Sequence, residues 1–178
     1  MASPPSQSGA GTSYNSRNMQ KNNDTYAITI YSSPLFFPLW FVVHTHIVVA
    51  RNGVTSRFEV LGRTPLARRE KLLHGYLYKN VLPPEAGLYV ICATSATSGI
   101  GPRWKTKKCS AVTGGENSVA HRIYEFFETD GVNKCPYIEN YNMVRGPNSN
   151  TFTQWVTNQF PEAQLKLPIN AWGKAYRK

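Results

Sequence analysis

The chain has 178 residues, of which 41% are hydrophobic and 12% aromatic, so it is long and apolar enough to bury the core of one domain. This composition excludes a wholly disordered protein. A formal net charge of +10 favours polyanionic partners such as nucleic acid or anionic lipid headgroups. A basic surface with no dedicated partner is the alternative, because no nucleic-acid-binding signature accompanies the charge.

Residues 1–25 are rich in Ser, Asn, Gln, Gly and Pro, which predicts a disordered N-terminal tail before a single domain at residues 26–178. The tail has no basic segment that leads into an apolar one, so we expect no secretory signal. The cysteines, Cys92, Cys109 and Cys135, show neither close pairing nor metal-type spacing. We therefore expect reduced thiols, a cytoplasmic location and no metal or other cofactor.

Two β-branched segments predict the first strands. Residues 26–31 alternate, and residues 40–50, with the sequence WFVVHTHIVVA, carry the strongest strand pattern in the chain. Residues 26–50 are apolar enough to raise the question of a membrane span, but prolines and histidines interrupt them. We therefore expect buried strand and loop here, and no transmembrane span.

A hairpin follows the strongest strand. Asn52-Gly53 is the dipeptide that most favours a two-residue turn, since both residues tolerate positive φ, and residues 55–62 form the returning strand. A two-residue turn places His46 opposite Glu59, with His44 two residues along on the same face. The hairpin therefore predicts a cluster of these three side chains. A register shift of one residue would separate them.

The remaining elements complete an α+β domain. A short apolar segment at residues 75–82 and a strand at residues 88–93 precede a Gly-, Ser-, Thr- and Lys-rich loop at residues 94–115. Apolar spacing and capping residues predict helices from residue 117 or 118 to about 129 and over residues 150–160. We expect a small antiparallel sheet packed against these two main helices.

A polar run precedes the second helix: Gly146-Pro147-Asn148-Ser149-Asn150-Thr151-Phe152. Asn148, Ser149 and Asn150 are all residue types that cap helix N-termini. A side chain at this position also lies beside free backbone N–H groups and the positive end of the helix dipole, which suits a nucleophile or an anion site. Arg145, just before the run, either binds a carboxylate or phosphate there or is exposed to solvent.

Four motifs resemble an uncharacterised family, mostly bacterial, that is known only as a domain of unknown function. They are His44-Thr45-His46, Arg57-Phe58-Glu59-Val60, the run Gly146 to Phe152 with Trp155, and Leu167-Pro168 with Gly173-Lys174-Ala175-Tyr176. The resemblance covers roughly residues 40–178. This chain departs from the family pattern at His46, where the family carries Trp. The resemblance implies no particular activity.

A second likeness concerns the order of the motifs. A histidine on a strand, a hairpin and a late Asn-Cys-x-x-Phe helix start resemble circularly permuted papain-like proteins, including cell-wall peptidase relatives and lecithin–retinol acyltransferase-like enzymes. The resemblance implies a hydrolase or acyltransferase that acts on an amide or ester. Ser149 would replace the nucleophilic Cys, His44 would be the base, and Glu59 or His46 would orient it. Arg145, Asn148 and Asn150 would have supporting roles.

Each of these residues also has a simpler interpretation. A helix N-terminus can ionise a thiol but not a serine hydroxyl, so Ser149 in place of Cys is typical of a lost or changed activity, or of a plain helix cap. His44 can be a core histidine, and Glu59 can form a structural ion pair with an arginine. His46 beside His44 suggests a metal, but the His-x-His pattern with one Glu also arises by chance on edge strands.

The competing function is a non-catalytic binding module. Its surface would be the basic run that contains Arg103, Lys105, Lys107 and Lys108, and its partner would be nucleic acid or anionic lipid.

Overall fold

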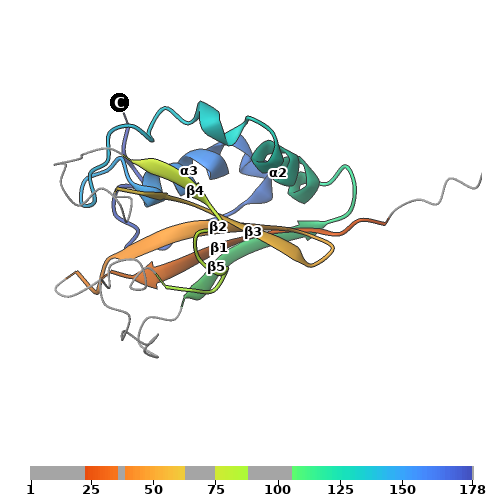
Figure 1. Cartoon of the computed structure of the whole chain (residues 1–178), viewed down its shortest axis with the longest axis horizontal. Helices are drawn as coiled ribbons and strands as arrows, with labels where there is room; N and C mark the ends of the chain where they lie inside the picture. The colour runs from red at the N-terminus through yellow and green to blue at the C-terminus, as the bar shows by residue number, and fades with distance from the viewer. Residues whose placement is uncertain (1–22, 36–38, 63–74, 88–105, 178) are drawn as a thin grey trace, which may run out of the picture.

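The computed structural model describes residues 23–35, 39–62, 75–87 and 106–177. Five antiparallel strands form one sheet in the order β4-β3-β2-β1-β5 (Figure 1). The strands are β1 (Tyr26–Pro34), β2 (Val43–Arg51), β3 (Val54–Leu61), β4 (Tyr76–Lys79) and β5 (Lys107–Gly114). Most of the predicted tail and the strand predicted at residues 88–93 lie outside the described residues.

The β2–β3 hairpin has the predicted two-residue turn. Asn52 and Gly53 both have positive φ, 51° and 81°, as a turn of this type requires. The register pairs Arg51 with Val54, and each following pair continues without a shift to Ile47 and Phe58. Extended by one residue, this register sets His46 opposite Glu59, and one ligand atom from each of His44, His46 and Glu59 lies within 4.8 Å of the others. The prediction that His44, His46 and Glu59 share one face of the hairpin is therefore confirmed.

Two helices cover one face of the sheet (Figure 1). Helix α2 (Val119–Glu128) begins at Ser118, whose side chain caps its N-terminus, and helix α3 (Ser149–Gln159) begins after Asn148. Short 3-10 turns, η2 (Val132–Lys134) and η3 (Pro161–Ala163), follow the two helices. Helix α2 packs mainly on β1 and β5, and α3 packs on β2 and β3. The predicted α+β architecture is thus confirmed.

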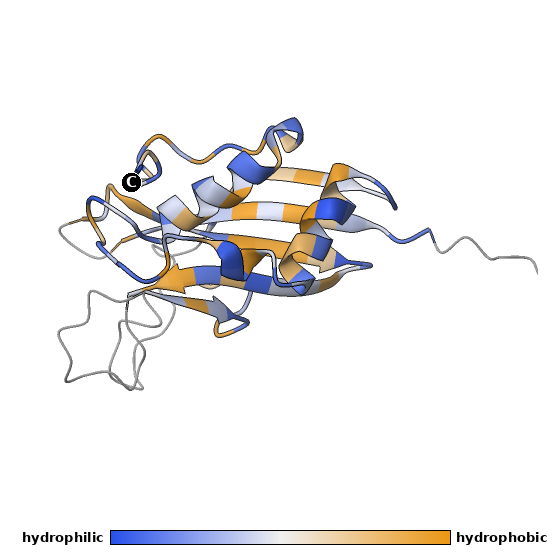
Figure 2. Cartoon of the chain, turned by 90° about the horizontal axis from the view of Figure 1, so that it is seen from above, coloured by the Kyte–Doolittle hydropathy of each residue, from blue (hydrophilic) through white to orange (hydrophobic). Residues whose placement is uncertain are grey.

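The main apolar core lies between the helices and the sheet. Viewed from above, hydrophobic positions recur along the strands that the two helices overlie (Figure 2). Ile28 and Ile30 of β1, Ile47 and Val49 of β2, and Phe58 and Val60 of β3 form this core with residues that include Ile123, Phe127, Phe152 and Val156 from the helices. Because strand side chains alternate, the residues between these core positions point to the opposite face of the sheet.

The prediction of a loop over residues 94–115 is wrong for its last part, because residues 107–114 form β5. This strand pairs with β1 and lies at the edge of the sheet. Its sequence, KKCSAVTG, has only intermediate and exposed residues. An edge strand with one solvated face needs little apolar alternation, which is why the composition indicated a loop.

The apolar stretch of residues 26–50 supplies β1 and β2. Within the described ranges, no helix combines the length and the apolar content that crossing a membrane requires.

Candidate functional site

A buried charged cluster lies on the face of the sheet that the helices leave uncovered. Glu59 Oε2 lies 2.8 Å from His44 Nε2 and 2.8 Å from Arg57 Nη2. The three side chains are at most 2% exposed. Thr45, between the two histidines of β2, bonds Asn150 of α3 through its backbone N–H and its hydroxyl. Because neighbouring side chains on a strand point to opposite faces, His44 and His46 point away from α3.

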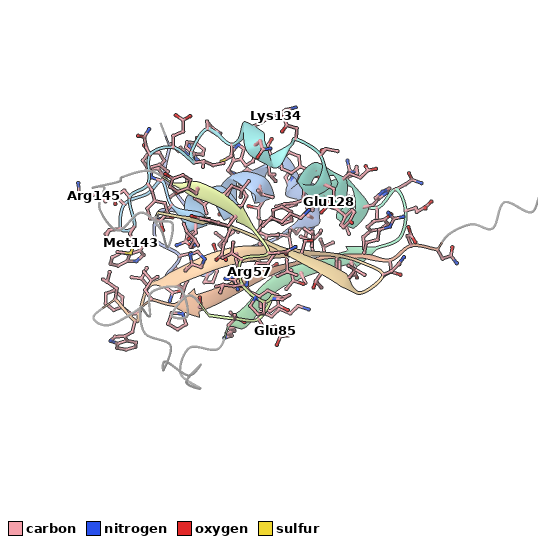
Figure 3. All side chains as sticks on the ribbon, viewed as in Figure 1. Arg57, Glu85, Glu128, Lys134, Met143 and Arg145 are labelled. Atoms are coloured by element: carbon pink, nitrogen blue, oxygen red, sulfur yellow. The ribbon has the colours of Figure 1, made fainter. Side chains whose placement is uncertain are left out.

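Arg57 ties this cluster to the turn that follows β4. Its Nη1 donates to the carbonyl oxygens of Pro83 at 2.9 Å and Ala86 at 2.6 Å, while Nη2 donates to Glu59. Figure 3 shows Arg57 at the level of the sheet and Glu85 beyond it, on the side away from the helices. A fully buried guanidinium is costly unless its charge is paired and its donors are satisfied. Here one carboxylate and two carbonyl oxygens accept three hydrogen bonds from the guanidinium group.

The carboxylate of Glu59 stays ionised despite its burial. Burial alone would raise its pKa, because desolvation disfavours the charged form. The hydrogen bonds from His44 and Arg57, together with the positive charge of Arg57, outweigh this effect and lower the pKa to about 2. The cluster therefore contains a permanent negative charge next to His44, which suits a carboxylate that orients an imidazole.

His46 is held in its neutral form. Burial, followed by the positive charge of Arg57, lowers its pKa to about 3. Its Nε2 lies 2.9 Å from the carbonyl oxygen of Pro84 and must donate, since a carbonyl only accepts. The proton is therefore on Nε2, and Nδ1 carries a free lone pair. The ring of Tyr31 stacks against that of His46 with centroids 5.5 Å apart.

Several polar atoms in and around the cluster lack a partner. Within the described part of the chain, the buried side-chain atoms without a hydrogen bond are Ser33 Oγ, His46 Nδ1, Arg57 Nε and Glu59 Oε1. Buried polar atoms are normally paired, so unpaired ones need an explanation such as a ligand or a catalytic role. These four come from adjacent strands on one face of the sheet. We therefore take this cluster as the candidate functional site.

Stability should fall in mild acid because of His46. In the unfolded chain its pKa is near 6.5, and in the folded protein it is about 3. Between these values the unfolded state binds one more proton, so the free energy of unfolding should fall by up to about 1.4 kcal/mol per pH unit from this group. Glu59, with its pKa of about 2 against 4.5, adds a further loss only at lower pH. Urea unfolding between about pH 7 and pH 4 measures the slope.

The matched variant for this pH dependence is His46→Phe, which keeps an aromatic ring but cannot take up a proton. Its unfolding free energy should depend less on pH over the same interval. Parallel curves for the two proteins would show that His46 is not held neutral by the fold.

Ser149 is not part of this cluster. It is the first residue of α3 and is 3% exposed, and the N-cap is Asn148. Because α3 covers the opposite face of the sheet from His44, the sheet lies between them. Among the described residues, no hydrogen bond joins Ser149 to His44. The structure thus brings together His44, Glu59 and His46 of the predicted site, but not the predicted nucleophile.

Asn148 and Asn150 have extensive structural contacts. The Asn148 side chain accepts from the backbone N–H groups of Asn150 and Thr151, forming a capping box with Thr151, and its Nδ2 lies 3.1–3.3 Å from three backbone carbonyls. Asn150 joins α3 to β2 and also donates to the carbonyl of Trp172. Both side chains therefore fasten the helix start to its surroundings.

The other predicted residues lie on the surface or outside the described ranges. Arg145 is exposed and lies at one end of the molecule, away from Arg57 (Figure 3). Lys107 and Lys108 are exposed on β5, while Arg103 and Lys105 lie outside the described residues. Binding of nucleic acid or anionic lipid through this basic surface stays a prediction.

Sequence reasoning missed Ser33 because the first predicted strand ended at residue 31. Strand β1 continues to Pro34, and its register pairs Ser33 directly with His44. Two polar serines before a proline are typical of a turn, and only pairing with β2 and β5 keeps them extended. The local sequence carries no signal that would have placed Ser33 in the cluster.

Residues 25–176 match the family model described as "Protein of unknown function (DUF3750)". The chain belongs to the DUF3750 family. This match confirms the predicted resemblance to a family of unknown function. It begins before β1, so the DUF3750 domain includes the whole sheet described above. No curated protein and no solved structure matches the chain, and no match supports a relationship to permuted papain-like proteins.

Proposed function

We propose that this DUF3750 protein is a hydrolase or acyltransferase that acts on an amide or ester, with His44 as general base and Glu59 as the carboxylate that orients it. The observation that carries the proposal is the 2.8 Å contact between His44 Nε2 and Glu59 Oε2 in a buried site, with Arg57 holding the same carboxylate. A serine nucleophile needs a base in hydrogen-bond reach and a third group that orients that base.

Ser33 is the nucleophile that this geometry favours. It lies directly across from His44 in the β1–β2 register, and side chains of opposed residues on one face of a sheet are neighbours. Its hydroxyl is buried and has no hydrogen-bond partner among the residues that the structure describes. Ser149, in contrast, belongs to the helix on the other face. Hydrogen bonds in catalytic sites often form fully only when substrate is bound, so an unpaired hydroxyl beside a base is compatible with this role.

The reaction follows from these positions. With Nε2–H of His44 donating to Glu59, Nδ1 is the nitrogen that accepts the proton of Ser33 Oγ as the oxygen attacks the carbonyl carbon of the substrate. The same proton then passes to the leaving amine or alcohol, and an acyl-serine remains. Water completes a hydrolysis, and another acceptor completes an acyl transfer. Glu59 stabilises the imidazolium that exists between the two proton transfers.

A substrate must reach the cluster past the segment Pro83–Ala86. Pro84 bonds His46, and Arg57 bonds Pro83 and Ala86, so this segment covers the charged side chains. A hollow of about 440 Å³ opens beside it on the uncovered sheet face. Residues that line the hollow include Tyr31, Val48, Ala50, Pro83 and Pro84. The mainly apolar lining suits the non-reacting part of an apolar ester or amide.

A fluorophosphonate probe, which reacts with activated serines, tests the proposal on the intact protein. We expect labelling of Ser33 that is lost in Ser33→Ala and retained in Ser149→Ala, which serves as the matched control. His44→Gln should slow labelling by about 100-fold or more, because general-base catalysis contributes factors of this size.

Peptide mapping of the labelled protein locates the modified serine. Labelling at Ser149 would instead support the assignment predicted from the sequence and overturn the role of Ser33. The absence of labelling, or labelling that His44→Gln leaves unchanged in a folded protein, would overturn the proposed function.

A further inference from the structure

We infer that His44, His46 and Glu59 form a binding site for a divalent transition-metal ion of the zinc type. The inference goes beyond the proposed function and does not depend on it. One ligand atom from each of these residues lies within 4.8 Å of the others, and all three side chains are buried. Two imidazoles and one carboxylate are a ligand set that zinc uses in proteins, with a fourth position left open.

Two of the three residues already present a free ligand atom. Pro84 holds the proton of His46 on Nε2, so the lone pair of Nδ1 is available, and it has no partner in the described part of the chain. A histidine that donates its other ring N–H to a backbone carbonyl is the usual arrangement around bound metals, because it fixes the tautomer and the ring orientation. Arg57 bonds Oε2 of Glu59, and no described residue bonds Oε1. Both free atoms are buried, where an unpaired acceptor is costly.

The third ligand requires a proton shift. His44 Nε2 now donates to Glu59, and a nitrogen that carries a proton cannot bind a metal. His44 can carry its proton on Nδ1 instead, which frees Nε2. The ion would then replace the His44–Glu59 hydrogen bond with two coordination bonds. Because His44 cannot donate to Glu59 and bind the ion through the same nitrogen, the metal-bound and metal-free states of the cluster are alternatives.

The positions of the ligand atoms set a limit on this site. Two ligands at about 2.1 Å from one ion are at most about 4.2 Å apart, so separations of up to 4.8 Å must contract by several tenths of an ångström or more. Binding therefore requires small rotations of His44 and His46. Because Nε2 of His46 donates to the carbonyl of Pro84, Nδ1 can bind the ion without losing a proton. The charge of Arg57 opposes the ion, so we expect a moderate rather than an extreme affinity.

The test measures zinc binding by isothermal titration calorimetry with the intact protein, after treatment with a chelator. We expect one zinc ion per chain and an affinity that falls at least about 10-fold in His46→Gln. Glutamine can still donate to Pro84 but lacks the imidazole lone pair. The matched control is His121→Gln, which removes a histidine of α2 on the other side of the sheet and should leave the affinity unchanged. Absence of stoichiometric binding, or equal loss in both variants, would overturn the inference.

Cobalt provides a second readout that needs no variant. Co²⁺ bound by two imidazoles and a carboxylate in the native protein should show visible d–d absorption bands, and zinc should displace them. Failure to observe these bands on titration with Co²⁺ would also overturn the inference. Metal uptake without serine labelling would support the metal site and overturn the proposed hydrolase. Serine labelling without metal uptake would support the proposed hydrolase and overturn the metal site.

Discussion

Replacing Arg57 by Met should lower the free energy of unfolding by about 3–5 kcal/mol, the range measured when one partner of a buried ion pair is removed. The substitution keeps much of the side-chain volume but leaves the carboxylate of Glu59 without its guanidinium partner. The carbonyl oxygens of Pro83 and Ala86 lose their donors as well. Urea unfolding followed by circular dichroism at neutral pH measures the loss.

The matched control is Arg122→Met. Arg122 pairs with Glu162 on the surface, where both side chains are about half exposed, and such pairs contribute only about 0–1 kcal/mol. If Arg57→Met costs no more than this control, the cluster is not a tightly coupled buried network. A double variant, Arg57→Met with Glu59→Leu, should recover part of the loss, because it removes the uncompensated charge.

Replacing Asn150 by Leu should cost about 3 kcal/mol or more and should loosen the start of α3. The Asn150 side chain accepts from the backbone N–H of Thr45 and donates to the carbonyls of Val43 and Trp172. Leucine has a similar volume but none of these hydrogen bonds, and each buried backbone group left unpaired costs about 1–3 kcal/mol. Urea unfolding gives the total, and amide hydrogen exchange shows whether the loss is greatest in α3 and β2.

Asn158→Leu is the control for this prediction, since Asn158 is an exposed residue of the same helix. It should change stability by no more than about 0.5 kcal/mol, as surface substitutions usually do. Equal costs at the two positions would mean that Asn150 does not hold α3 against the sheet.

The Asn-rich run at residues 146–152 is the most distinctive sequence motif, and it lies apart from the candidate site. Asn148 caps α3 and Asn150 links it to β2, so both act on the helix-covered face of the sheet. His44 and Glu59 lie on the other face. The Asn-rich run therefore explains how the domain is held together, whereas the chemistry that we propose belongs to the first hairpin and β1.

The sequence by itself determined the local features of this protein. Asn52-Gly53 specified the turn, and strand alternation then placed His44, His46 and Glu59 on one face. Capping residues and apolar spacing predicted both helices to within one or two residues. These features depend on backbone preferences and side-chain periods within a few residues, which is the range over which a sequence can be interpreted directly.

Only the tertiary structure decided which face of the hairpin the helices cover. Both faces of β2 are buried, so its sequence does not distinguish the face that packs against α3 from the face that holds the charged cluster. Arg57 reaches Pro83 and Ala86, and Ser33 meets His44, through pairings between segments distant in sequence. Such contacts depend on how complete elements pack together. The sequence alone therefore pointed to Ser149 as the partner of His44, whereas the structure places Ser33 beside it.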